Sequence, residues 1–438
     1  MNVVLVGTNH VTDYNGENDL HTGVAVPKSA YSHGVYVDGA LNISGTGTLN
    51  AASADANKGS YGIMCRGNIT VSGGTVNTIG AEAEYNSYGI MCWGSITILG
   101  GTVNAVGTEA GDTFYSYGIM CQGSISISGG TLSAKSTSKN TKVIISAMNK
   151  APDLSGYSGC TALASESADI EPTKLYNPAD HDSYKYIKIQ TLYDVWVGGV
   201  RITSENTGGV TGAGITGAVS YAPDTKTLTL NNATISESFF LPPDTSAAIY
   251  ADSDLNIALV GTNNVTNYNS AVGGYNYAVS VIGALSISGD GTMNASADAT
   301  VVSYGIMGWD GITILGGTVN ATAAEAEHAS YGIFSGGSIT ILGGTVSAKS
   351  TSTTATAVAM NKAPDLSDYS GCTALASESA DIEPTKLYNP ADHDSYKYIK
   401  IQTLYDVWVG GVRITSENTG GVTGAGITGA VSYAPDTK

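Results

Sequence analysis

Charged residues are scarce in this sequence, and so are proline, cysteine, tryptophan and phenylalanine. Only 13% of the 438 residues are charged, and the chain has 11 Pro, 5 Cys, 4 Trp and 4 Phe. Intrinsic disorder goes with high charge and low apolar content, whereas 42% of these residues are apolar. The composition therefore excludes a disordered chain, and five cysteines in so long a chain exclude a disulfide-stabilised scaffold.

Basic residues and long apolar runs are also missing. Lys and Arg number 19 against 37 Asp and Glu, which gives a net charge of −18. So acidic a chain is repelled by phosphate backbones and anionic membranes, and we expect no nucleic-acid partner. No stretch approaches the roughly 18 apolar residues of a membrane-spanning helix, so no membrane insertion is expected. The opening Met1-Asn-Val-Val-Leu-Val-Gly also lacks the basic region and cleavage site of a signal peptide.

Glycine is abundant, with 56 copies, and it recurs within a short repeat. The motif Ser-Tyr-Gly-Ile returns at spacings of 27 and 29 residues in the first half of the chain and 27 in the second, with its tyrosine at Tyr61, Tyr88, Tyr117, Tyr304 and Tyr331. Each copy leads into a segment such as residues 68–77, where alternation places Ile69, Val71 and Val76 inward and Thr70, Thr75 and Asn77 outward. Gly-Gly pairs supply the backbone freedom that the corners between strands require. The pattern predicts an all-β, right-handed, single-stranded parallel β-helix, also called a β-solenoid.

A longer repeat has a period of 212 residues. Residues 149–226 and 361–438 match at every position except Gly156, which becomes Asp368. The pattern predicts tandem β-helix modules at 1–150 and 227–362, joined or followed by small β caps at 151–226 and 363–438. The caps are expected to close one solenoid and open the next. Both termini align with interior positions, so we expect a piece of a longer polypeptide whose signal and anchor lie elsewhere.

Three side-chain rows emerge when the coils are aligned. Cys65, Cys92 and Cys121 share an inward position, which favours a buried thiol ladder over a metal site, because no CxxC pair is present. An outward apolar row is followed two residues later by a mixed row, with the pairs Met64 and Arg66, Met91 and Trp93, Met120 and Gln122, Met307 and Trp309, and Phe334 and Gly336. Either the surface formed by these two rows contacts a ligand, or a loop around 82–86 or 109–115 covers it.

The other outward ladder consists of threonine and asparagine. Its members are Thr75, Thr102, Thr131, Thr318 and Thr345, with Asn77, Asn104 and Asn320. Such arrays can hydrogen-bond to sugars, and in long flat solenoids they can bind ice, but the variable loops count against ice. Stacked amides that pair along the ladder are the alternative.

Groups suited to catalysis are few. The only arginines are Arg66, Arg201 and Arg413, and the acidic residues Asp13, Asp252, Asp254 and Asp310 are scattered at coil turns. We therefore expect no enzymatic activity. The loop Asp180-His181-Asp182, repeated as 392–394, could hold a cation, but a solvated loop is the expectation. No metal ligand set is assigned.

The strand runs resemble a known family. Segments 255–266, 285–295 and 311–321 are similar to bacterial carbohydrate-binding β-helix proteins of clostridia, which have a pectate-lyase-like fold without catalysis and bind calcium. The resemblance covers residues 1–134 and 227–348. It implies a polysaccharide partner and makes calcium the one cofactor to consider. Residues 193–206 also resemble a module repeated in surface proteins of gut Firmicutes, which implies an extracellular or cell-surface location.

These observations together predict a noncatalytic protein that binds polysaccharide through several weak sites. The candidate ligand-binding residues are Arg66, Met91, Trp93, Thr102, Asn104, Gln122, Met307, Trp309, Thr318 and Asn320. The first alternative is a stalk, filament or adhesin that self-associates end to end or laterally. The second alternative, suggested by the fold alone, is a polysaccharide lyase or hydrolase.

Overall fold

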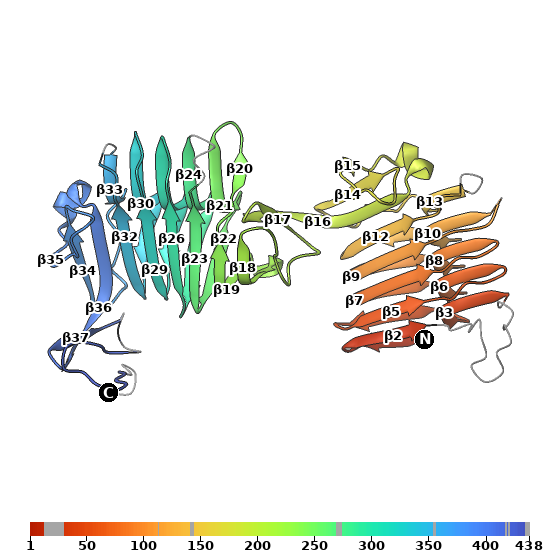
Figure 1. Cartoon of the computed structure of the whole chain (residues 1–438), viewed down its shortest axis with the longest axis horizontal. Helices are drawn as coiled ribbons and strands as arrows, with labels where there is room; N and C mark the ends of the chain where they lie inside the picture. The colour runs from red at the N-terminus through yellow and green to blue at the C-terminus, as the bar shows by residue number, and fades with distance from the viewer. Residues whose placement is uncertain are drawn as a thin grey trace. The chain divides into compact units, whose positions relative to one another are not determined.

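The computed structural model confirms the predicted all-β solenoid. It describes residues 1–12, 30–112, 114–140, 144–268, 274–353, 356–416, 418 and 421–433. Strands make up 58% and helices 4% of the structure, and parallel coils stack into about 11 turns within these residues. The chain divides into two compact units, Met1–Leu192 with Thr203–Glu205 and Tyr193–Ile202 with Asn206–Lys438. The division falls inside β16 (Tyr186–Val197), some distance before the predicted boundary at residue 226 (Figure 1).

In the first unit, each full coil contributes strands to three parallel ladders. The first ladder joins β1 (Asn2–Leu5), β4 (Leu41–Gly45), β7 (Ile69–Gly80), β9 (Ile96–Gly107) and β11 (Ile125–Ile127). The second joins β2 (Thr8–Thr12), β5 (Thr48–Ala52), the later halves of β7 and β9, and β12 (Thr131–Ser136). The third joins β3 (Tyr31–Val37), β6 (Gly59–Cys65), β8 (Asn86–Cys92), β10 (Tyr115–Cys121) and β13 (Ile144–Met148).

The second unit repeats this arrangement. Its first ladder joins β19 (Thr227–Ile235), β22 (Leu255–Val260), β25 (Ala284–Gly289), β28 (Gly311–Ile314) and β31 (Ser338–Ile341). The second joins β19, β23 (Thr262–Asn267), β26 (Thr292–Ala297), β29 (Thr318–Ala323) and β32 (Thr345–Ser350). The third joins β21 (Thr245–Ala251), β24 (Tyr275–Val281), β27 (Val302–Gly308), β30 (Ala329–Ser335) and β33 (Thr356–Met360).

Each unit has its own apolar core inside the coils. Ile69, Val71 and Val76 are buried, while Thr70, Thr75 and Asn77 are half-buried on the outer side, as the alternation predicts. The same positions on the next coil, Ile96, Ile98 and Val103, stack against them in register. Burying a β-branched side chain of this size contributes about 1.5–3 kcal/mol. The stacked rows therefore account for the register of the ladders.

The glycine of the Ser-Tyr-Gly-Ile motif faces the interior where two strands come close together. A Cβ added at Gly62 would lie 2.6 Å from the Gly89 carbonyl oxygen and 2.7 Å from the Ile79 amide nitrogen. Gly305 meets the same pair of obstacles in the second unit, at 2.6 Å from the Gly332 carbonyl oxygen and 2.8 Å from the Thr322 amide nitrogen. Only glycine leaves room for this close approach, which keeps each coil narrow.

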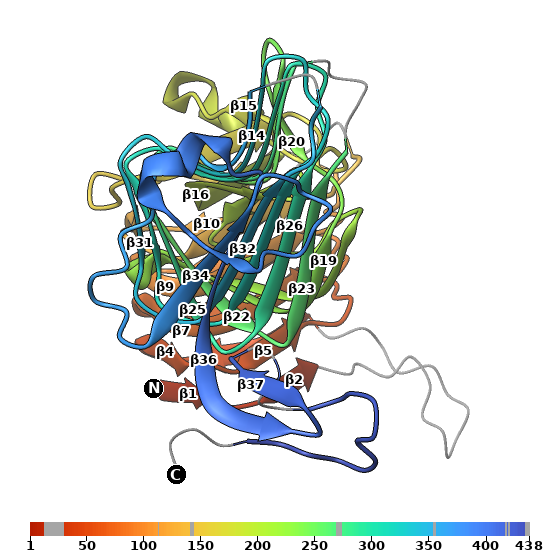
Figure 2. The ribbon, with the colours of Figure 1, turned by 90° about the vertical axis from the view of Figure 1, so that its left-hand side faces the viewer.

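A cap closes the C-terminal end of each solenoid. In the first unit, β14 (Cys160–Ser165), β15 (Lys174–Leu175), the 3-10 helix η1 (Pro178–Ser183) and the start of β16 form this cap. β16 runs antiparallel to β12, with Leu132 opposite Ile189. In the second unit, the cap comprises β34 (Cys372–Ser377), β35 (Lys386–Leu387), η3 (Pro390–Ser395) and β36 (Tyr398–Val409), and β36 pairs with β32 (Figure 2). The antiparallel strands cover edges that would otherwise be open to further pairing.

The N-terminal end of the second solenoid is also covered. β18 (Ile215–Ala222) pairs antiparallel with β19, and η2 (Pro223–Thr225) makes the turn between them. The end of β16 and the short β20 (Phe239–Leu241) both pair with β21. The short strands β17 (Val200–Thr203) and β37 (Val412–Thr415) follow β16 and β36, respectively. The repeated segment at residues 149–226 thus contributes strands to the end of the first solenoid and to the start of the second.

Candidate functional site

The predicted row of Arg66, Trp93 and Gln122 lies on three consecutive rungs of the first unit. The Trp93 amide donates to the Cys65 carbonyl at 3.0 Å, and the Gln122 amide donates to the Cys92 carbonyl at 2.9 Å. All three residues directly follow strands of the third ladder. Coil stacking therefore fixes their spacing along the solenoid surface.

Three of the predicted residues line one groove on this face. Arg66, Met91 and Trp93 line a hollow of about 390 Å³. The other lining residues are Tyr31, His33, Tyr36, Tyr61 and Met64. Met64 belongs to the predicted apolar row and Tyr61 to the Ser-Tyr-Gly-Ile repeat, whereas the sequence did not single out Tyr31, His33 and Tyr36. The groove thus combines aromatic rings, thioethers and a guanidinium group on one surface. Gln122 lies one rung beyond it, and its backbone carbonyl accepts a hydrogen bond from Lys150 Nζ.

A ladder of aromatic rings forms the floor of this face. The ring centroids of His33 and Tyr61 lie 5.5 Å apart, those of Tyr61 and Tyr88 5.5 Å apart, and those of Tyr88 and Tyr117 5.7 Å apart. Met64, Met91 and Met120 pack against the three tyrosines. Burial raises the pKa of Tyr61 to about 12, so its hydroxyl stays protonated at physiological pH. The tyrosine of the Ser-Tyr-Gly-Ile repeat was the sequence signal for this ladder.

Two aromatic rings flank the guanidinium group of Arg66. Its central carbon lies 5.2 Å from the Trp93 ring centroid and 6.0 Å from that of Tyr36. Its Nη1 atom also lies 3.1 Å from an Asp38 carboxylate oxygen. Because both side chains of this ion pair are largely exposed, the pair contributes at most about 1 kcal/mol. The rings and the carboxylate hold the guanidinium in place at the edge of the groove.

The second unit has an aromatic patch of different composition at the corresponding place. Trp309 follows β27 and is 54% exposed, and its ring centroid lies 6.4 Å from that of Phe334. Phe334 in turn stacks on Tyr304, with centroids 4.7 Å apart. Met307 is buried in one cluster with Tyr304 and Phe334 and presents little surface. Trp309 is thus an exposed aromatic platform in the second unit, whereas Met307 belongs to the buried cluster.

Hydrogen bonds between stacked side chains connect the asparagine ladder. Asn77 Nδ2 donates to Asn50 Oδ1 at 2.7 Å, and Asn104 Nδ2 donates to Asn77 Oδ1 at 2.8 Å. Asn320 bonds to Asn294 in the same way, at 2.8 Å. Thr102 and Thr318 are half-buried beside this ladder. The structure therefore places Thr102, Asn104, Thr318 and Asn320 on another ladder from the groove, in a pattern of pairing amides.

The threonine row ends beneath the caps. Thr131 and Thr345 are both buried, and their hydroxyl groups hydrogen-bond to Ser204 at 2.7 Å and to Ser416 at 2.6 Å. These two threonines therefore connect the last rungs to the segments that cover them.

The predicted buried thiol ladder is present. Cys65, Cys92 and Cys121 are buried and unbridged, and the Cys92 and Cys121 backbones lie in register. The Cys65 thiol donates to the Gly39 carbonyl at 2.9 Å, and burial raises its pKa. The hydrogen bond with Cys121, together with burial, raises the pKa of Cys92. The same hydrogen bond lowers the pKa of Cys121. The three buried thiols pack as small apolar groups with weak donors.

The described residues contain no group of three or more His, Cys, Asp or Glu side chains arranged to hold a metal ion. Among the scattered acidic residues, Asp254 accepts from the Ala284 amide at 3.0 Å and Asp252 accepts from the Tyr250 hydroxyl at 3.2 Å. Asp13 lies outside the described residues. Calcium prefers six to eight oxygen ligands, and the described carboxylates do not fit that requirement. No role for calcium is derived from them.

The expectation of a solvated loop at Asp180-His181-Asp182 is wrong for its histidine. Asp180 and Asp182 are exposed, but His181 is only 7% exposed. The segment folds as the 3-10 helix η1, which begins at Pro178 after an Asn177 N-cap and turns the imidazole inward. His393 occupies the same position in the second cap. No hydrophobic period predicts this burial, because the short 3-10 helix lies between irregular segments.

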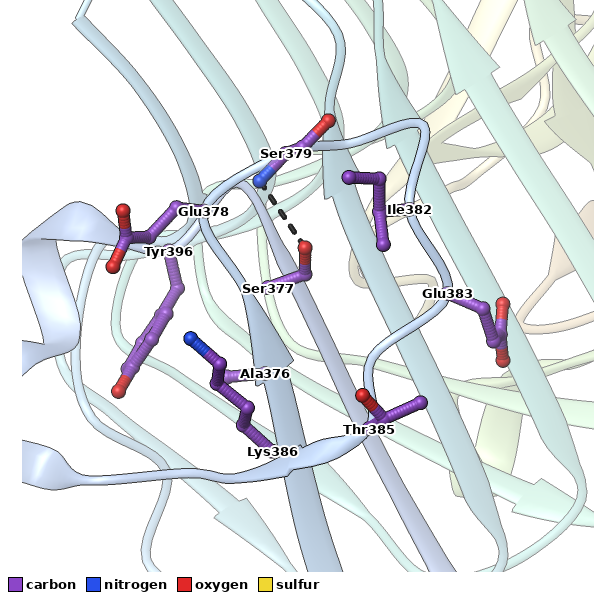
Figure 3. Close-up of a pocket in the computed structure, with 9 residues that line it drawn as sticks. All are labelled: Ala376, Ser377, Glu378, Ser379, Ile382, Glu383, Thr385, Lys386 and Tyr396. Carbon is purple, nitrogen blue, oxygen red and sulfur yellow. Dashed lines mark hydrogen bonds between the residues drawn. The ribbon is translucent and has the colours of Figure 1, made fainter.

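Each cap also contains a small cavity. The two cavities have volumes of about 240 and 250 Å³ and equivalent linings, and Figure 3 shows the second one. Tyr396 and Ala376 are its buried residues, and Ile382 lies at its exposed side. Burial acts to raise the pKa of the Glu383 carboxyl, but the Lys400 ammonium at 2.7 Å outweighs it, so this pKa lies below its ordinary value. The main acidic group of the cavity is therefore already paired within the cap.

No protein-family model, curated protein or solved structure matches this chain. Among the described residues, no helix has the length and apolar character that crossing a membrane requires.

Proposed function

We propose that this chain is a noncatalytic polysaccharide-binding protein of the cell surface or extracellular space. The observation that carries the proposal is the groove of the first unit, where Trp93, Tyr36 and Arg66 lie together on one face. Ligand sites typically combine aromatic walls with a few placed polar groups, and this groove does so.

The chemistry of the groove suits a sugar ring. The π-faces of Trp93 and Tyr36 offer flat surfaces for the apolar CH groups of a pyranose. The Arg66 guanidinium supplies hydrogen-bond donors for ring and hydroxyl oxygens. None of the eight lining residues is a carboxylate, whereas hydrolytic cleavage of a glycosidic bond generally uses two. The groove is therefore better suited to binding than to cleavage.

Repetition would strengthen weak binding. The Trp309 patch supplies a second aromatic surface in the same chain. When two weak sites engage one repetitive glycan, the second binding event becomes intramolecular, and the avidity exceeds either single affinity.

A structural role as a stalk or filament is the second candidate. The asparagine ladders favour this role, because their side-chain amides hydrogen-bond to one another between successive coils rather than to a ligand. Such a role requires no glycan.

A glycan array and a pull-down with insoluble polysaccharides test the proposal. The chain should bind at least one polysaccharide, Trp93→Ala should weaken binding at least about tenfold, and Trp309→Ala should reduce avidity. Trp408→Ala provides the matched control, because this exposed tryptophan lies outside both patches. Failure to bind any glycan would favour the stalk. Equal binding by Trp93→Ala and the wild type would remove the groove from the mechanism, and release of unsaturated or reducing ends would show an enzyme.

A further inference from the structure

The buried histidine of each cap is a titratable group that the groove does not use. His181 Nδ1 lies 2.8 Å from the Tyr176 hydroxyl oxygen, and the two rings meet edge to face with centroids 5.9 Å apart. The other ring nitrogen, Nε2, is buried without a hydrogen-bond partner. A polar atom in that condition is costly, and it becomes more costly when the ring carries a charge.

Backbone hydrogen bonds connect this histidine to the last rung of the solenoid. The Tyr184 amide donates to the His181 carbonyl at 3.3 Å, and the Ala147 amide of β13 donates to the Tyr184 carbonyl at 2.7 Å. The Ser146 hydroxyl donates to the same Tyr184 carbonyl at 3.3 Å. On its other side β13 pairs with β10. The segment that holds His181 therefore satisfies the outer edge of the final strand in the third ladder.

The groups that face the imidazole have opposing effects on its charge. Burial lowers the pKa of His181, while the Met148 backbone carbonyl and the Asp182 carboxylate favour the protonated ring. Tyr176 and Tyr184 pack around the histidine, and burial raises the pKa of Tyr176 to about 12. From β10, Tyr117 lies within the field of Asp182, and burial raises its pKa to about 12. β13 carries no titratable side chain. Burial prevails, so the ring is neutral in the closed cap at physiological pH.

We propose that His181 and His393 act as proton-sensitive latches that release the caps from the last rungs of the solenoids as the pH falls. A closed cap disfavours the imidazolium ion, whereas an open cap exposes the ring to water. The open state therefore binds more protons, and the free energy of opening decreases as the pH falls below the ordinary histidine value of about 6.5. Opening would uncover the edges of β13 and β33, and uncovered edges can pair with other strands.

The second cap has the same geometry. His393 is equally buried, its Nδ1 lies 2.8 Å from the Tyr388 hydroxyl oxygen, and its Nε2 also lacks a partner. The Tyr396 amide donates to the His393 carbonyl at 3.2 Å, and the Ala359 amide donates to the Tyr396 carbonyl at 2.8 Å. Asp394 and the Met360 carbonyl oppose the effect of burial on its pKa, as their counterparts do in the first cap. Both caps should therefore respond to acid in the same way.

Hydrogen exchange of the Ala147 and Ala359 amides tests the proposal in the full chain. Their protection, corrected for the intrinsic pH dependence of exchange, should decrease severalfold between about pH 7.5 and about pH 5, while the core amide of Val103 stays protected. The double variant His181→Gln/His393→Gln should abolish this decrease. His328→Gln, at an exposed histidine, is the matched control and should behave like the wild type.

A second measurement keeps the proposal testable if the double variant does not fold. In the wild type, NMR should show that His181 and His393 titrate below the ordinary histidine value of about 6.5. Titration of His181 and His393 at that ordinary value would overturn the latch, as would unchanged protection of Ala147 and Ala359 in acid. Equal acid sensitivity of the wild type and the folded double variant would also overturn it, because the histidines would then not be the groups that bind the proton.

Discussion

Replacement of Gly62 by alanine is the sharpest test of how the coils are held narrow. Gly62 lies in β6 between Tyr61 and Ile63, and its φ angle is accessible to any residue, so the substitution adds a methyl group without backbone strain. That methyl carbon would lie 2.6 Å from the Gly89 carbonyl oxygen and 2.7 Å from the Ile79 amide nitrogen. Both obstacles are backbone atoms, on β8 and β7, and a side-chain rotation cannot move either one.

The expected cost follows from this lack of relief. Overpacking a core typically costs about 1–3 kcal/mol, and we place Gly62→Ala near about 3 kcal/mol because two strands have to shift. For a unit of roughly 190 residues this corresponds to a fall in melting temperature of about 6–12 °C. Gly156→Asp is the control, because Asp368 occupies that position in the second copy of the repeat.

Scanning calorimetry would measure the melting temperature, and hydrogen exchange would show where the loss of protection lies. Protection should decrease in β6, β7 and β8. If Gly62→Ala melted within about 1 °C of the wild type, the close approach of these strands would not limit the width of the coil, and the explanation of the Ser-Tyr-Gly-Ile glycine would fail.

Three further predictions concern other parts of the structure. Asn77→Ala removes two ladder hydrogen bonds and should lower the free energy of unfolding by about 1–2 kcal/mol in urea titrations, and no change would show that water replaces them. Trp196→Ala should cost about 2 kcal/mol, because this ring stacks on Phe239 with centroids 4.5 Å apart. The identical substitution at Trp408, which is 56% exposed, should cost less than about 0.5 kcal/mol, and equal costs would contradict the stacking argument. A thiol reagent should modify the half-buried Cys160 and Cys372 first in the native protein, and the three ladder thiols only after unfolding.

The features that the sequence could predict are those encoded by strict alternation. Ile69, Val71 and Val76 repeat at the same offsets in successive coils, so their inward direction and the position of the buried Cys92 follow from a period of two. The coil spacing likewise determines which residues lie above one another. Arg66 and Trp93 are one coil apart in the sequence, and in the structure their side chains are in contact.

Other features depend on contacts that a one-dimensional pattern does not contain. Tyr88 belongs to an outer aromatic floor that packs against the methionine row, and alternation is interrupted at the adjacent glycine, so its direction could not be read from the period. The methionines are partly buried against this floor, and Glu82 and Glu109 line a separate cavity. The burial of His181 depends on the way a single helical turn meets a strand distant in sequence.

The unequal coil spacing shows where this architecture tolerates insertions. The loop between β9 and β10 has two more residues than the loop between β7 and β8, yet Ser87 and Ser116 remain exact partners in the ladder. The extra length leaves the rungs unchanged because only the outer loop absorbs it. These loops are therefore sites where peptides could be inserted at a regular interval along the solenoid. Natural variants could also carry longer loops there without a change in the core.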